Sequence, residues 1–131
     1  MKRTSVNPWQ WSLQFGFNQG ELVEGHERVL FCASQTSIDG DGNMQHAGDI
    51  RAQITLAVDN LEAVLLEGGM TLANVVRLTI YTTEMGDMMK NFDVLFSRLE
   101  KAGVKPAQTM LGVAALAMRE LMVEIEATAV G

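Results

Sequence analysis

Two glutamates, Glu124 and Glu126, lie near the C-terminus in a segment that alternates between apolar and polar residues. The alternation over 121–130 predicts a β-strand, so the two carboxylates share one face of it, about 7 Å apart. On a solvated face they are simply two repelling charges. At a subunit boundary one of them loses solvent and its pKa rises, which suits proton transfer to a bound water or substrate. The sequence leaves both interpretations open.

Other residue types that do chemistry are sparse. His26 and His46 have no second histidine or cysteine at metal-ligand spacing, so we expect no metal site. Cys32 lies in an apolar segment without a cationic neighbour, which favours a buried, inert thiol. Residues 39–43 are similar to a calcium loop but lack the glycine and glutamate that an EF-hand requires, so they predict a turn. No phosphate-binding, dinucleotide or serine-nucleophile motif is present, and we expect no cofactor.

The composition sets further limits. The chain has 131 residues, a formal net charge of -6 and 47% hydrophobic residues. Its length predicts a single domain over 1–131, and the acidic balance argues against binding to nucleic acid. No apolar run approaches the roughly 20 residues that span a bilayer, so we expect no membrane association. The single cysteine and the absence of a signal-peptide core predict a cytoplasmic protein.

The periodicity of the sequence predicts the elements that hold these residues. Apolar residues at helical spacing predict one helix from Ile50 to Leu65, capped by Asp49, and a second from Met88 to Leu99. The predicted strands cover 13–17, 21–23, 29–33, 75–83, 109–116 and 121–130, the first two as a hairpin. The order β-β-β-α-β-α-β-β predicts an α+β fold with both helices on one face of the sheet.

The second face of that sheet carries too many apolar residues for a surface in water. Residues 29–33 are apolar on both sides, which predicts a central strand, and 109–116 has apolar residues on both sides as well. We therefore expect the face without helices to pack against another copy of the chain. An N-terminal segment folded across it is the alternative.

Several motifs, in their order and spacing from about Phe15 onward, resemble the RidA (YjgF) superfamily, once described as L-PSP endoribonucleases. They are Cys32-Ala33-Ser34-Gln35, Gln53 with Asp59-Asn60-Leu61, Asn91, Pro106-Ala107-Gln108-Thr109 and Val123-Glu124-Ile125-Glu126-Ala127. The resemblance implies a chorismate-mutase-like α+β fold with a mixed sheet. It also implies a homotrimer around a β-barrel core, with a small-molecule cleft at each subunit interface.

Active members of that family hydrolyse enamines and imines released by pyridoxal-phosphate enzymes, without a metal or cofactor, and an arginine binds the substrate carboxylate. Gln108 stands at the position of that arginine and offers a neutral donor in place of a cation. Ala33 replaces a serine of the family's motif, although Ser34 is adjacent. Phe17 matches a cleft tyrosine without its hydroxyl.

Two other cleft positions match the family. Asn91 is retained, and the resemblance gives Glu124 the catalytic role of positioning the hydrolytic water. One hypothesis is therefore a deaminase-like hydrolase acting on a neutral or amide-bearing imine. The alternative is a trimeric binding or regulatory module that uses the same cleft, lined by Phe17, Gln108 and Thr109 among others, without chemistry. The acidic charge argues against RNA cleavage.

Overall fold

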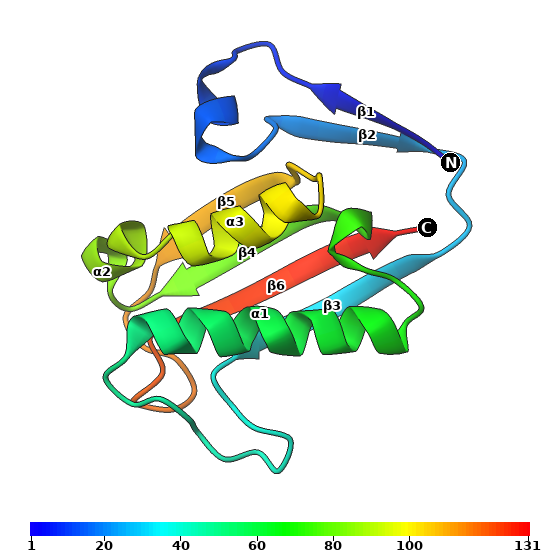
Figure 1. The fold of residues 1–131 in the computed structure, drawn as a ribbon. Helices are drawn as coiled ribbons and strands as arrows, with labels where there is room; N and C mark the ends of the chain where they lie inside the picture. The colour runs from blue at the N-terminus through cyan, green and yellow to red at the C-terminus, as the bar shows by residue number, and fades with distance from the viewer.

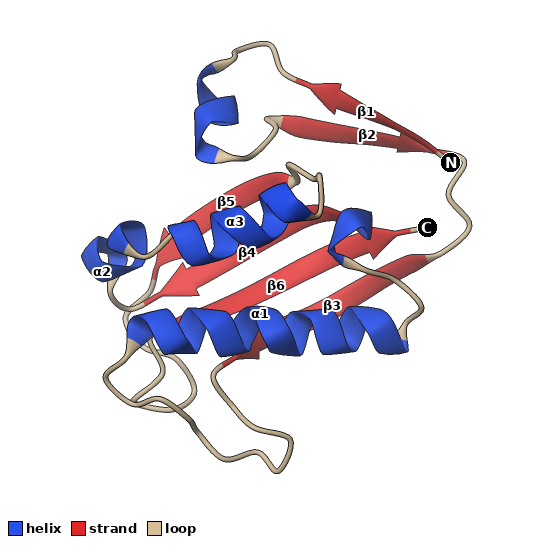
Figure 2. Ribbon diagram, in the orientation of Figure 1, coloured by secondary structure: helices blue, strands red, loops and turns tan.

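The computed structural model describes residues 1–131. Figures 1 and 2 show a sheet with helices along one face and a separate hairpin at one end. The elements in chain order are β1 (Lys2–Val6), η1 (Trp11–Phe15), β2 (Gly20–Glu24), β3 (Val29–Thr36), α1 (Ile50–Glu67), η2 (Leu72–Asn74), β4 (Val75–Thr82), α2 (Met85–Lys90), α3 (Asp93–Lys101), β5 (Ala107–Gly112) and β6 (Val123–Val130). No helix is long and apolar enough to cross a membrane.

The main sheet has four strands in the order β3-β6-β4-β5. β4 and β5 are parallel, whereas β6 runs antiparallel to both of its neighbours. Helix α1 packs on β3 and β6, and α3 packs beside α1 on the same face (Figure 1). The predicted α+β fold with a mixed sheet and helices on one face is confirmed. The face without helices is called the open face below.

Helix α1 forms where its periodicity predicted it. Ile54, Val58 and Leu61 recur at helical spacing and are fully buried. The Asp49 side chain accepts a hydrogen bond from the backbone N–H of Ala52 at 3.1 Å, which satisfies one of the free amides at the start of the helix. The buried stripe of α1 therefore covers β3 and β6 on this face of the sheet.

The predicted single second helix is wrong, because two short helices, α2 and α3, replace it. The chain leaves the helical path at Asn91, whose side chain donates to the carbonyl of Asp87 at 2.8 Å. Asparagine side chains that bond to nearby backbone compete with helical hydrogen bonds and favour helix ends. Because of this break, α2 lies beyond the N-terminal end of α3 as a separate short helix (Figure 1).

The prediction of a central strand at 29–33 is also wrong, since β3 extends to Thr36 and is an edge strand. The apolar residues on the two sides of β3 lie in different environments. Cys32 is buried against the helix side, whereas Phe31 is 79% exposed on the open face. The excess apolar character therefore reflects a face with no partner within the chain.

The N-terminal hairpin differs from the predicted one. β1 pairs with β2, so residues 2–6 supply the first strand, and residues 13–17 include a short 3-10 helix instead. The strand went unpredicted because Lys2–Val6 is mostly polar. Arg3 forms an ion pair with Glu21 at 3.1 Å within the hairpin, and it holds the hairpin against the main sheet by a hydrogen bond to the carbonyl of Val75.

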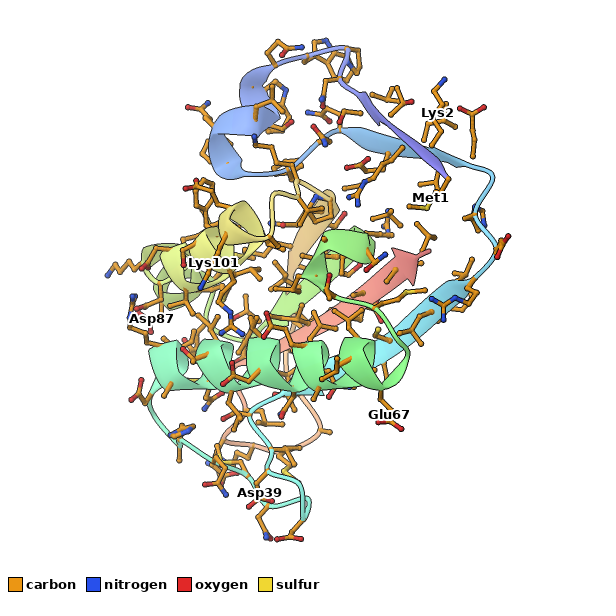
Figure 3. The ribbon with its side chains drawn as sticks, turned by 45° about the vertical axis from the view of Figure 1, so that its right-hand side comes forward. Met1, Lys2, Asp39, Glu67, Asp87 and Lys101 are labelled. Carbon is orange, nitrogen blue, oxygen red and sulfur yellow. The ribbon has the colours of Figure 1, made fainter.

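The remaining strands and the long loop complete the fold. β5 and β6 are shorter than predicted and cover 107–112 and 123–130. Asp39 accepts hydrogen bonds from the backbone N–H groups of Asp41 and Asn43, which confirms the predicted turn. Figure 3 places Asp39 at the opposite end of the molecule from Met1 and Lys2 of the hairpin.

Candidate functional site

One group of the predicted site residues lines a pocket beside the edge strand β5. Phe17 and Gln108 face a volume of about 280 Å³ that is otherwise apolar. We call it the β5 pocket, and its lining residues are Phe15, Phe17, Met89, Phe92, Gln108 and Met110. None of these side chains carries a charge, so the pocket offers apolar surface and a single amide.

The N-terminal segment positions Phe17 in this pocket. Gly16 takes a left-handed conformation with a φ of 82° at the end of η1, which favours glycine. A Cβ atom there would lie 2.7 Å from the ring of Phe96, so no larger residue fits without a shift. Asn18 then bridges Ala107 of β5, and its N–H donates to the carbonyl of Lys105 at 3.1 Å. Phe17 is thereby held next to Gln108.

Asn91 lies near this pocket but does not line it. Its side chain donates to Asp87, and its oxygen accepts from Arg51 at 3.5 Å. Its neighbour Phe92 supplies a wall of the pocket. Within one chain, Asn91 therefore shapes the α2–α3 break that places Phe92.

The second group of site residues lies on the open face. Glu124 and Glu126 are both half-buried, while the alternating residues of β6 point to the core. The hydroxyl of Tyr81 on β4 donates to Oε1 of Glu126 at 2.6 Å. The predicted facing of the two carboxylates is confirmed.

Burial raises the pKa of Glu124, and the neighbouring charge of Glu126 raises it further. The pKa of Tyr81 is also raised, first by its hydrogen bond to Glu126 and then by burial. The phenol therefore keeps its proton and donates a hydrogen bond to Glu126. The raised pKa of Glu124 makes this carboxyl more inclined to accept a proton than a free glutamate side chain. The two glutamates are chemically distinct despite their equivalent places in the sequence.

Ala33 and Ser34 lie beside these carboxylates. Cys32 pairs with Ala127 and Gln35 with Ile125, with a register shift between the two pairs. The residues 33 and 34 thus oppose the single residue 126, the arrangement of a β-bulge, which commonly re-aims side chains next to functional sites.

The two groups lie on opposite faces of the sheet. Gln108 pairs with the core residue Leu78, so it points to the helix side. Glu124 of β6 pairs with Tyr81 of β4 and lies on the open face, and β4 separates β6 from β5. Within one chain, Gln108 and Glu124 cannot contact the same small molecule.

Thr109 belongs with the open face. Thr109 pairs with Thr79 of β4, which lies on the same face of the sheet as Tyr81. The side chain of Thr109 is exposed. The motif 108–109 therefore contributes one residue to each side of the sheet, as adjacent residues of a strand must.

Sequence reasoning missed four residues of the β5 pocket and the phenol of Tyr81. The missed pocket residues are Phe15, Met89, Phe92 and Met110. Among these residues only Met89 could have been noticed in the sequence, because it is an apolar residue that lies off the apolar stripe of its predicted helix. In the structure it is 56% exposed, whereas its neighbour Met88 is buried. No group of three or more His, Cys, Asp or Glu side chains is arranged to hold a metal ion.

Because Tyr81 is the only tyrosine in the chain, the ultraviolet absorbance of tyrosinate reports its ionisation alone. We expect Glu126→Gln to lower the pKa of Tyr81 toward the ordinary value, since the charged acceptor that holds the proton is gone. Glu124→Gln is the matched control and should lower it less. Identical titration curves for the wild type and Glu126→Gln would contradict the assigned contact.

The fold and this distribution of residues can be compared with known proteins. The family model described as Endoribonuclease L-PSP matches residues 15–131. A RutC family protein of Pyrococcus abyssi is 31% identical over 100 residues, which cover 76% of each chain. The chain also superposes on solved structures of two related proteins.

The first is YyfB of Yersinia pestis, a protein of unknown function in the conserved Rid family, with a TM-score of 0.88, 33% identity and full coverage of both chains. The second is a YjgF/YER057c/UK114 family member from Mycobacterium tuberculosis, with a TM-score of 0.67 and 30% identity over 99% of this chain and 100% of that one. These likenesses agree with the family resemblance of the sequence. The chain therefore belongs to the RidA/YjgF (L-PSP) family.

Proposed function

We propose that this protein assembles as a homotrimer and that each subunit interface forms a cleft in which uncharged imines are hydrolysed to a carbonyl compound and ammonia. The observation that carries the proposal is the separation of Gln108 and Glu124 on opposite faces of the sheet. A cleft that contains both residues needs the β5 pocket of one copy and the open face of another.

The open face supports self-association. Phe31 is 79% exposed there, and Leu111 on β5 is 45% exposed. Burying one phenylalanine side chain is worth about 1.5 to 3 kcal/mol. A second copy laid on this face removes both side chains from water and desolvates Glu124 further, which raises its pKa more.

In the proposed reaction Glu124 accepts a proton from a bound water as the water oxygen attacks the imine carbon. Glu124 returns this proton to the former imine nitrogen, which gives a neutral carbinolamine. It then transfers the proton of the carbinolamine hydroxyl to the same nitrogen as the C–N bond breaks, which releases ammonia and leaves a C=O group. An enamine enters the same path after tautomerising to its imine. The raised pKa of Glu124 suits both acceptance and return of the proton.

Gln108 sets which imines bind. The hydrogen bond of a guanidinium to a carboxylate is worth roughly 1.5 to 3 kcal/mol, and a neutral amide supplies no opposite charge. Loss of about 3 kcal/mol weakens binding roughly a hundredfold. Carboxylate-bearing imines are therefore poor substrates. The same absence of a cation favours, as a second candidate, a trimer that binds an uncharged ligand in this cleft without chemistry.

Assembly through the open face is tested with Phe31→Arg. We expect light scattering to give a mass several times 14.3 kDa for the wild type and a mass near 14.3 kDa for the variant, because the charge is buried on association. Leu66→Arg is the matched control, since Leu66 is 73% exposed on α1, away from the open face, and should leave the assembly intact. A monomeric wild type at micromolar concentration would overturn the proposed assembly.

Catalysis is tested by ammonia release from freshly generated imines, either uncharged or with a carboxylate as in 2-aminoacrylate. We expect the uncharged imines to be hydrolysed faster, and Glu124→Gln to lower the rate about 10²- to 10⁴-fold, the usual loss of a general base. Gln108→Arg should gain activity on the carboxylate imines, since it restores the cation. If the wild-type trimer accelerates none of these reactions, the binding module replaces the hydrolase.

A further inference from the structure

We infer that the β5 pocket selects an uncharged ligand with a flat apolar body and a primary-amide or lactam edge that pairs with the side chain of Gln108. The inference deepens the proposed function, because it names the ligand class of the same cleft. It rests on the existence of that cleft, but not on any chemistry within it.

The side chain of Gln108 has an unmet hydrogen-bonding requirement. Its Oε1 atom is buried and has no hydrogen-bond partner in the chain. A buried acceptor without a donor has lost its hydrogen bonds to water and gained none in return, which is unfavourable. The last bond of a glutamine side chain turns with a broad, two-fold preference, so a rotation of the amide offers either the oxygen or the NH₂ group to the pocket.

The walls of the pocket cannot satisfy that amide. The other five lining residues are two methionines and three phenylalanines, none of which is a strong donor or acceptor. A ligand amide can do so in either orientation of the Gln108 side chain, because its N–H donates to Oε1 or its carbonyl accepts from Nε2. A single kind of ligand group therefore satisfies whichever half of the Gln108 amide faces the pocket.

The same walls specify the rest of the ligand. Phe15 and Phe17 both stack edge-to-face with Trp11, at centroid distances of 6.4 and 5.9 Å, which holds their rings in place. The volume of about 280 Å³ lies just below the range usual for drug-sized ligands, so one small ring fits best. A ligand carboxylate in this pocket would lose its water without gaining a cation, which disfavours its binding.

A competing arrangement involves Gln19. Its Nε2 atom is also buried without an acceptor, and Gln19 lies one residue beyond Asn18, which bridges Ala107. Gln108 is one residue beyond Ala107. If the two amides pair with each other in solution, Gln108 is not free for a ligand.

Benzamide and benzoate are matched probes, because they share a ring and differ in the amide and the charge. We expect titrations followed by the methyl NMR signals of Met89 and Met110 to show benzamide binding at least about 10-fold more tightly than benzoate. Gln108→Arg should reverse the preference. Gln108→Met keeps the shape of the side chain, and should weaken benzamide about 10-fold while leaving toluene binding unchanged.

Equal binding of the two probes to the wild type, or unchanged benzamide affinity in Gln108→Met, would overturn the inference. So would benzamide binding that tightens more than about 10-fold in Gln19→Leu, since it would show that the two glutamines pair in the native chain. Neither probe reacts, so a benzamide preference without ammonia release from any imine would remove the hydrolase alone. Ammonia release from imines without a benzamide preference would remove this inference alone.

Discussion

The structure depends on the covering of the sheet by helices on one face only. α1 and α3 bury the helix side of β6 and β4, and this packing forms the core of the chain. The open face keeps two carboxylates, a tyrosine and exposed apolar side chains. Strand β5 then presents Gln108 to the helix side and Thr109 to the open face, because adjacent residues of a strand point in opposite directions. The chain thus divides the candidate site residues between two faces of the sheet that it does not bring together.

The N-terminal segment depends on the same sheet. The hydrogen bond from Arg3 to the carbonyl of Val75 anchors the hairpin at the start of β4, and the bridge from Asn18 to Ala107 anchors it at the start of β5. Between these anchors, Gly16 turns the chain so that Phe17 meets Gln108. The hairpin therefore completes the β5 pocket and leaves the open face uncovered, which excludes the alternative that the N-terminus folds across it.

Local patterns predicted the elements whose stability is local. Helix α1 followed from its apolar spacing, and the facing of Glu124 and Glu126 followed from strict alternation along β6. β1 could not be predicted in this way, because a polar strand is held by the distant contacts of Arg3. The break at Asn91 went unpredicted because the apolar stripe continues through it.

The candidate site likewise contains residues that the sequence predicted and residues that it did not. The family resemblance supplied Phe17, Gln108 and Glu124, each of which lies in one of the two groups. The contact between Tyr81 and Glu126 joins residues 45 positions apart, and no short motif carries it. The apolar walls of the β5 pocket looked like ordinary core positions, since a methionine or phenylalanine gives the same signal whether it is buried by the chain or by a ligand.

The central claim, that each site draws one half from each of two copies, is tested most directly by mixing two defective variants. Gln108→Trp fills the β5 pocket, Glu124→Gln removes the proton acceptor, and each alone is inactive in ammonia release from an uncharged imine. Coexpression in equal amounts should restore about a quarter of the wild-type rate, since a cleft that combines two copies at random receives both intact halves in that share. Mixed assemblies, verified by mass, that remain as inactive as the separate variants would contradict the account.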